Sequence, residues 1–180
     1  LNVLLKGLLK PGDHVLVTAM EHNAVMRPLV QLEKHGISFD RIPCASDGSL
    51  LLDKATALLR PETKLVVCLH ASNVCGTVMP AQEIGDFCKE HGLLFILDTA
   101  QTAGTLDIDM EKYHIDALAF TGHKGLRGPQ GTGGFLIRNE LAVTVPAGSS
   151  FFRTHGDLSS GSQNHLNRFF TFRHSGCETA

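Results

Sequence analysis

Short apolar runs recur along the chain at intervals that leave room for a helix between them. Most of these runs have no polar alternation, which is typical of strands whose two faces are both covered. Turn-forming residues lie at the ends of these runs, and each run has the length of a strand. The sequence therefore predicts strands at residues 14–18, 37–42, 64–70, 93–97, 115–120 and 134–137.

Between the apolar runs, apolar residues recur every three or four positions. This spacing predicts helices over residues 1–9, 22–35, 50–59 and 81–91. Gly36 and Gly92 are suitable helix stops, and Ser49 is a suitable cap for the third helix. Pro28 is expected to disturb the first turns of the second helix.

Strands that alternate with helices of about 10 to 15 residues predict an α/β domain. We expect three layers, α/β/α, with a mostly parallel sheet between two layers of helices. Beyond about residue 145 the chain has no clear period, and no element is predicted there. Residues 1–140 are therefore expected to form the domain, with 141–180 as an irregular tail. The chain has no initial Met and opens in a helical pattern, so we expect a fragment of a longer protein.

Charge and cysteine content narrow the classes of partner. Lys and Arg number 16 and Asp and Glu 18, so the formal net charge of −2 does not favour nucleic acid or anionic lipid and leaves small molecules as the expected partners. No apolar run reaches the ~18 residues that a membrane span requires. The 5 cysteines include no C-x-x-C pair and are odd in number, which favours free thiols and a cytoplasmic location.

Polar clusters follow four of the predicted strands, where ligands bind in open parallel sheets. Each cluster has an ordinary structural explanation: His22 can start a helix, Asn73 can form a turn, Asp98 can cap a helix, and Lys124 can be solvated. Together they favour a site, because an acid, an amide, an imidazole and a lysine at one edge of a sheet suit a cofactor that accepts electrons. The clusters are residues 21–24, 70–73, 98–101 and 121–125.

The order of these motifs resembles a known family. Glu-His-Asn-Ala, Ser-Asn-Val-Cys-Gly-Thr, Asp-Thr-Ala-Gln-Thr-Ala-Gly and Thr-Gly-His-Lys-Gly-Leu-Arg-Gly-Pro-Gln-Gly follow one another. This combination is similar to class V aminotransferases, a group of pyridoxal 5'-phosphate (PLP) enzymes of fold type I, and within it to cysteine desulfurases and selenocysteine lyases. The resemblance covers residues 1–138 and implies an incomplete large domain of that fold.

The resemblance implies roles for three residues that act on the PLP ring. Lys124 matches the lysine that carries PLP as a Schiff base and later transfers protons. Asp98 matches the carboxylate that pairs with the pyridine nitrogen. His22 matches the imidazole that stacks on the ring and takes part in catalysis.

Four further residues match cofactor-binding positions of the family. Gln101 matches a side chain near the ring hydroxyl, and Asn73 one on the cofactor or substrate side. Thr121 and His123 match the hydroxyl and imidazole that hold the phosphate, in a Gly-rich turn suited to an anion.

The reaction that the resemblance implies is removal of sulfur from L-cysteine to give alanine. It also implies a cysteine or selenocysteine substrate, a sulfur acceptor protein and a homodimer. Selenocysteine lyase or another class V activity would use the same cofactor residues. The cysteine that carries the persulfide is unassigned, because neither Cys75 nor Cys177 lies in the matching context.

Two other classes stay open on the sequence alone. The chain is alternatively a non-catalytic remnant, since the upstream phosphate turn and the small domain of the family have no counterpart in it. Gly131-x-Gly133 loosely resembles a nucleotide-binding loop, but the full G-x-G-x-x-G spacing is absent. No metal site is predicted, because the 10 histidines show no ligand spacing.

Overall fold

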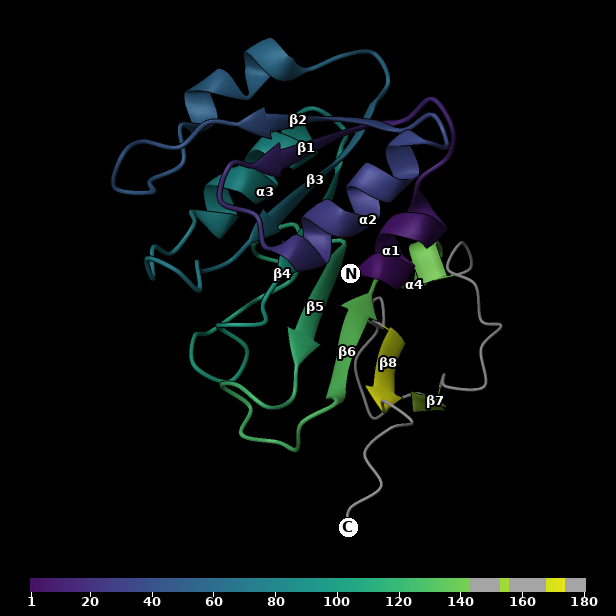
Figure 1. Cartoon of the computed structure of the whole chain (residues 1–180), viewed down its shortest axis with the longest axis vertical. Coiled ribbons are helices and arrows are strands. Elements are labelled where there is room, and N and C mark those ends of the chain that lie inside the picture. The colour runs from purple at the N-terminus through teal and green to yellow at the C-terminus, as the bar shows by residue number, and fades with distance from the viewer. Residues whose placement is uncertain (143–152, 156–167, 174–180) are drawn as a thin grey trace.

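A computed structural model describes residues 1–142, 153–155 and 168–173. Within these residues the chain forms one twisted sheet of eight strands in the order β2-β1-β3-β4-β5-β6-β8-β7 (Figure 1). The five strands β2, β1, β3, β4 and β5 are parallel to one another. At the other end of the sheet, β6, β8 and β7 each pair antiparallel with their neighbours. The strands are β1 (His14–Thr18), β2 (Ser38–Ile42), β3 (Thr63–Leu69), β4 (Leu94–Asp98), β5 (Ala117–Thr121), β6 (Thr132–Ile137), β7 (Arg153–His155) and β8 (Arg168–Arg173).

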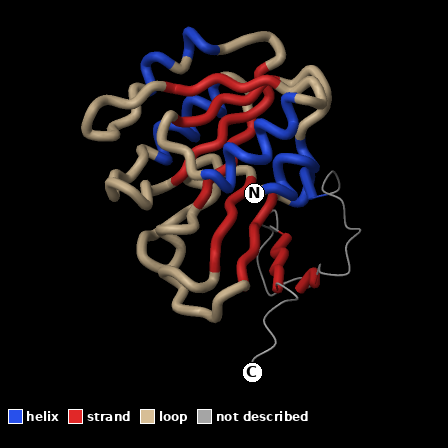
Figure 2. The backbone as a smooth tube through the Cα atoms, in the orientation of Figure 1, coloured by secondary structure: helices blue, strands red, loops and turns tan. Residues whose placement is uncertain are grey.

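Helices cover both faces of the sheet and create two separate apolar cores (Figure 2). One face carries α1 (Asn2–Leu8), α2 (Asn23–Glu33) and α4 (Asn139–Ala142). The other carries α3 (Ala81–Glu90) and two 3₁₀ turns. β1 is buried at all five positions, and its side chains point alternately into the two cores. The predicted three-layer α/β/α fold with a mostly parallel sheet is confirmed.

The chain reverses its direction of travel across the sheet between β1 and β3. From β1 it crosses through α2 to β2 on one side, then returns to β3 on the other side of β1. Such a switch point leaves a crevice at the carboxyl ends of the two strands, because the connections leave it in opposite directions. This crevice is where a ligand is expected.

The helix predicted over residues 50–59 is wrong. The chain instead forms 3₁₀ turns at Leu52–Lys54 and Thr56–Leu58. A turn that includes Gly48, whose φ is 85°, brings Leu50 into an antiparallel bridge with Cys44, so that Leu50 cannot begin a helix. Asp47, not Ser49, accepts the local backbone hydrogen bond, from the Ser49 N–H.

Two further expectations are corrected. α2 continues through Pro28, so the proline does not interrupt the helix. The region beyond residue 145, where no element was predicted, contains β7 and β8. β7 is three residues long, too short for a period to show, and β8 mixes Phe with Arg and Thr. No described helix has the length and apolar character that crossing a membrane would need.

Candidate functional site

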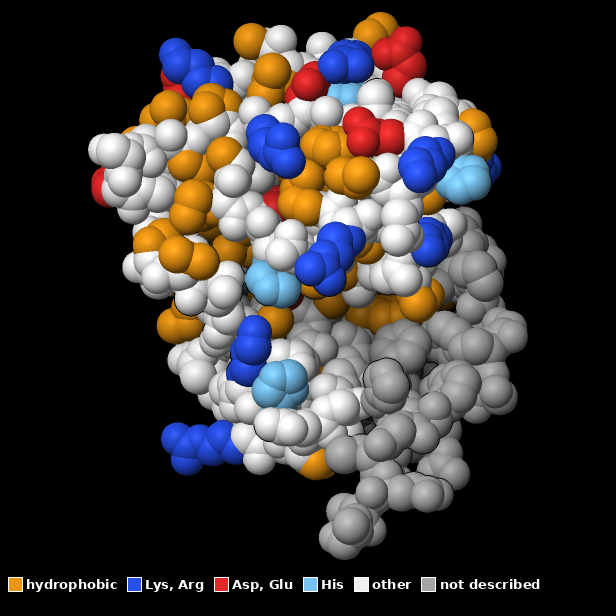
Figure 3. Space-filling model, viewed as in Figure 1, with side chains coloured by type: hydrophobic (Ala, Val, Ile, Leu, Met, Phe, Trp, Pro, Cys, Tyr) orange, Lys and Arg blue, Asp and Glu red, His pale blue; other side chains and the backbone are white. Residues whose placement is uncertain are grey.

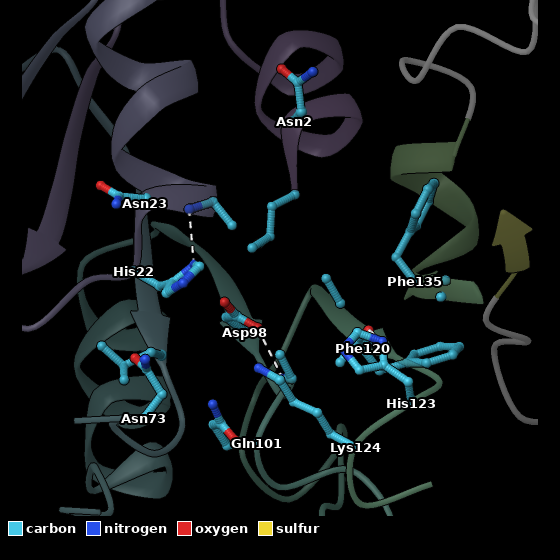
Figure 4. A pocket seen from close by; sticks show the side chains of 18 of the residues that line it. Asn2, His22, Asn23, Asn73, Asp98, Gln101, Phe120, His123, Lys124 and Phe135 are labelled. Atoms are coloured by element: carbon cyan, nitrogen blue, oxygen red, sulfur yellow. Dashed lines mark hydrogen bonds between the residues drawn. The ribbon is translucent and has the colours of Figure 1, made fainter. Parts of the chain in front are cut away.

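A cleft of about 820 Å³ opens at the carboxyl ends of β3, β4 and β5. Its walls come from α1, the start of α2, the loops after these strands and the start of β6 (Figure 4). All four predicted clusters contribute to it, although six of their members do not line it: Glu21, His70, Ser72, Thr99, Gly122 and Gly125. The cleft contains all seven residues predicted to form the site: His22, Asn73, Asp98, Gln101, Thr121, His123 and Lys124.

Asp98 is the last residue of β4 and is only 6% exposed. Its Oδ1 accepts a hydrogen bond from the Ala100 N–H at 2.9 Å, so it caps a turn and not a helix. Burial raises the pKa of the Asp98 carboxyl, and the charges of His22 and Lys124 oppose that rise. Burial therefore decides the direction of the shift, and the two cationic groups offset only part of it.

Lys124 reaches the cleft from the loop that follows β5, and Figure 4 shows its side chain extending toward Asp98. The loop is held by close backbone packing, because a Cβ on Gly125 would lie 2.5 Å from the Ala103 carbonyl oxygen. Arg127, with φ of 52°, turns the chain so that its N–H bonds the Lys124 carbonyl at 2.8 Å. The loops after β4 and β5 therefore position Lys124 and Asp98 together.

His22 is the N-cap of α2 and lies on the opposite wall from Lys124. Its Nδ1 accepts a hydrogen bond from the Ala24 N–H at 3.1 Å. In the neutral ring the proton is therefore on Nε2. The cap fixes the ring at the entrance to the helix, next to the cleft (Figure 4).

Thr121 and His123 form a polar pair at the end of β5. Their Oγ1 and Nδ1 atoms lie 3.1 Å apart. Gly122 between them leaves no room for a side chain, because a Cβ there would lie 2.1 Å from the Thr132 Oγ1. Backbone from Gly131 to Gly134 lines the same part of the cleft, which gives a wall with little steric bulk.

Asn73 and Gln101 complete the predicted set from the loops after β3 and β4. Asn73 is exposed in a tight turn in which the Ser72 Oγ accepts a hydrogen bond from the Val74 N–H at 3.2 Å. Gln101 is partly buried in the turn that starts at Thr99. Both point their polar groups toward the cleft in Figure 4.

The charge of the cleft favours an anionic ligand. Lys124 and Arg27 are its cations, and Asp98 is the single acidic residue among the described lining residues. On the face shown in Figure 3, Lys and Arg side chains are spread from the upper edge to the lower left, whereas acidic side chains are seen mainly in the upper half. An anion such as a phosphate monoester suits this distribution.

Sequence reasoning missed the contribution of α2 beyond the predicted cluster at residues 21–24. Arg27, Pro28 and Gln31 line the cleft from the same side of the helix as Ala24. Their spacing of three or four residues was a usable signal, because such residues share a helix face. Their position on the cleft side depends on how α2 packs and could not be predicted locally.

The cysteines do not form a catalytic arrangement in the described residues. Cys68 and Cys88 are buried, and burial raises the pKa of both thiols. Cys75 is exposed in the Asn73 turn, where hydrogen bonds with Ser72 and Thr77 lower its pKa to about 7. Cys177 lies outside the described residues. No group of three or more described His, Cys, Asp or Glu residues could hold a metal ion.

The family model described as Aminotransferase class-V matches residues 1–168. The match includes every element that lines the cleft. The chain therefore belongs to the class-V aminotransferase family. The match also extends past residue 138, where the resemblance read from the motifs ended.

Individual relatives within the family are desulfurases and a lyase variant. Cysteine desulfurase IscS of Vibrio campbellii is 35% identical over 150 residues, which are 81% of this chain and 37% of that protein. Apo cysteine desulfurase from Thermococcus onnurineus NA1 is 33% identical with a TM-score of 0.75, covering 88% of this chain and 41% of its own. A C-DES mutant with glycine covalently linked to its PLP cofactor is 30% identical with a TM-score of 0.72, covering 80% of this chain and 40% of its own. The chain spans well under half of each.

Proposed function

We propose that this chain is the PLP-binding part of an enzyme that removes sulfur from L-cysteine to give alanine. One observation carries the proposal: buried Asp98, at the end of β4, and the amine of Lys124, in the loop after the neighbouring parallel strand β5, face one cleft. Because neither side chain has another described ion-pair partner, the two are available to a ligand placed between them.

The residues present fit PLP by their chemistry. A carboxylate suits the protonated pyridine nitrogen, a lysine amine suits the aldehyde, and the Thr121–His123 pair beside bare glycine backbone suits the phosphate. The flat His22 ring on the opposite wall suits the face of an aromatic ring. A cleft of about 820 Å³ has room for both the cofactor and a small amino acid.

When bound, PLP supplies an electron sink for carbanion chemistry at the substrate Cα. The chain's own residues set the conditions for that chemistry. Asp98 would hold a proton on the ring nitrogen, and Lys124 Nζ would accept and return a proton at the substrate. His22 would limit the position of the ring, and Arg27 adds a positive charge on the side of α2.

Substrate and partners follow from the relatives and belong to the proposal. Cysteine desulfurase is the name that two of the three relatives above share, which supports L-cysteine over other amino acids. We further propose that the whole protein is a homodimer and hands sulfur to an acceptor protein. The four described cysteines are free thiols, in keeping with the cytoplasmic location proposed from the sequence.

The experiment is PLP titration of the purified 180-residue chain, followed by borohydride reduction and peptide mapping. We expect a visible absorbance band and a reduced pyridoxyl group on Lys124. Lys124→Ala should abolish this attachment completely while leaving the chain folded, because a partly buried loop side chain contributes little to the core.

Lys112→Ala is the matched control, since Lys112 is an exposed lysine outside the cleft. In the Lys112→Ala variant, PLP and borohydride should label Lys124 as they do in the wild type. A folded wild-type chain that gains no pyridoxyl group contradicts the proposal and favours the non-catalytic remnant. Label that persists in Lys124→Ala rejects Lys124 as the attachment site.

A further inference from the structure

A buried carboxyl group, Glu21, joins the two strands on either side of the switch point. Its Oε1 accepts a hydrogen bond from the Thr18 hydroxyl at 2.7 Å and another from the Leu69 N–H at 2.8 Å. Thr18 ends β1 and Leu69 ends β3. The residue immediately after Glu21 is His22, so the contact holds the backbone from which the imidazole enters the cleft.

The second oxygen of this carboxyl group has no partner. Glu21 Oε2 is fully buried and makes no hydrogen bond among the described residues. An ionised carboxylate can accept about four hydrogen bonds, whereas only two donors are present here and both use Oε1. A protonated carboxylic acid fits this environment better than a carboxylate, because leaving a buried charge partly unsolvated is costly.

The groups that face Glu21 from the neighbouring elements are acids and thiols. They are Asp98 at the end of β4, Cys68 in β3 and Cys44 after β2. No Lys, Arg or His in the described residues forms an ion pair with Glu21. A negative charge on Glu21 would therefore be repelled by Asp98 and would have no cation to pair with among the described residues.

We propose that Glu21 is a positioning residue that works as a neutral carboxylic acid, bridging β1 to β3 behind His22. The bridge holds the switch-point crevice in shape from beneath the cleft. Its neutrality leaves Asp98 as the single negative charge beside Lys124. The role in the cofactor site rests on the proposed function, whereas the bridge and its neutrality are properties of the chain alone.

The direction of titration supports this assignment. Burial raises the pKa of Glu21 from its ordinary value of 4.5 to about 8, although the Thr18 and Leu69 hydrogen bonds oppose the rise. Between these two values the unfolded chain has released the proton and the folded chain keeps it. The free energy of unfolding therefore falls as pH rises through this window.

The first experiment tests neutrality without any cofactor. Thermal unfolding of the apo chain is measured from pH 5 to pH 8.5 for the wild type and for Glu21→Gln, whose amide keeps the Oε1 acceptor without titrating. We expect the melting temperature of Glu21→Gln minus that of the wild type to rise by about 5 °C or more between pH 5 and pH 8.5, because only the wild type is destabilised as pH rises.

Glu33→Gln is the matched control, because Glu33 is an exposed glutamate in α2. Its difference from the wild type should stay constant with pH. A constant difference for Glu21→Gln as well would overturn the inference, because it would mean that Glu21 is ionised in the folded chain.

The second experiment tests positioning through PLP affinity at pH 7 and pH 9. Glu21→Ala leaves the Thr18 hydroxyl and the Leu69 N–H without their acceptor, so we expect PLP affinity to fall about tenfold at both pH values. Glu21→Gln should rescue most of that loss at pH 7. At pH 9 it should bind PLP more tightly than the wild type, in which Glu21 ionises.

The two proposals fail in different ways. A wild-type chain that binds no PLP contradicts the proposed function, while the melting experiment still decides whether Glu21 is neutral. Affinity that is equally low in Glu21→Ala and Glu21→Gln at pH 7, with Lys124 still labelled in the wild type, overturns the positioning role alone.

Discussion

The two ends of the same sheet both contain buried titratable side chains, but the two sets are arranged differently. At the amino end of β1, His14 is fully buried and lies between Thr63, 2.9 Å from Nδ1, and Asp40, 3.3 Å from Nε2. Arg60 binds Asp40 from the solvent side. At the carboxyl end, Asp98 and Glu21 form no ion pair among the described residues and lie in or beneath a cleft.

This difference separates a structural polar cluster from a functional one. The amino-end cluster places acid, imidazole and guanidinium beside one another, although His14 Nε2 makes no hydrogen bond. At the carboxyl end, Asp98 and Lys124 form no described ion pair and face a cleft, and Glu21 Oε2 has no hydrogen-bond partner. Charged groups that pair within their own cluster indicate packing, whereas unpaired charged groups that face a cleft at a switch point indicate binding.

The two ends also respond to pH in opposite directions. Burial, aided by Arg60, lowers the pKa of His14 below 6.5, while Asp40 opposes the shift. The stability that neutral His14 contributes is therefore present above pH 6.5 and is lost as pH falls. Raised pKa values at Asp98 and Glu21 have the reverse effect, since their contribution is lost as pH rises.

The largest contrast should come from adding one methyl group to a glycine at each end. Gly125→Ala places a Cβ 2.5 Å from the Ala103 carbonyl oxygen, so the Lys124 loop has to shift. We expect a loss of about 3 kcal/mol in the free energy of unfolding. Labelling of Lys124 by PLP should be lost as well, as borohydride reduction would detect.

Gly12→Ala is the partner substitution at the amino end. Gly12 has a φ of 97° but open space around it, so only backbone strain of about 1 kcal/mol is expected. Urea unfolding measures both costs. Equal costs, or intact Lys124 labelling in Gly125→Ala, would show that the loop contact does not hold the site.

The second contrast is the pH dependence at the amino end. His14→Gln should cost about 1.5 kcal/mol at pH 7.5, because it disrupts a partly buried hydrogen bond between the fully buried His14 and Thr63. This cost should shrink as pH falls to 5, since the wild type loses the contribution of neutral His14. Urea midpoints across this range measure it.

His35→Gln serves as the control, because His35 is exposed. Its cost should be small and independent of pH. A cost of His14→Gln that grows toward pH 5 would mean that His14 is protonated and paired with Asp40, and the contrast between the two ends of the sheet would be wrong.

The smallest expected effect concerns the solvent side of the amino-end cluster. Arg60 and Asp40 are each more than 30% exposed at the side chain, so Arg60→Ala should cost about 0.5 kcal/mol. Raising the salt concentration should reduce this cost. Lys64→Ala, at an exposed lysine without a described ion pair, is the control and should cost less.

Most strands could be predicted because they are buried on both faces. The run at residues 64–70 is almost wholly apolar, and β3 occupies all but its last position. Residues 50–59 misled the prediction because their apolar spacing is helical, while the Cys44–Leu50 bridge and the turn at Gly48 depend on contacts outside the segment. The antiparallel strands β7 and β8 were missed because β7 is three residues long and β8 mixes Phe with Arg and Thr.

The candidate site was predictable in its members because the carboxyl ends of parallel strands meet at one edge. His22, Asp98 and Lys124 each follow an apolar run, so the sequence alone determined that they approach one another. Glu21 was visible only as a polar residue next to His22. Its partner, the Leu69 N–H, lies 48 residues away.

What the sequence determined by itself was the alternation of strands and helices, the family and the set of residues at the ends of the strands. Periodicity and local motifs carry that information, because burial of a strand or helix imposes a repeat along the chain. The tertiary structure alone decided which carboxyl groups are desolvated, which lack a partner and how each responds to pH. Those properties depend on neighbours from distant parts of the chain, and desolvation and charge act through space, not along the sequence.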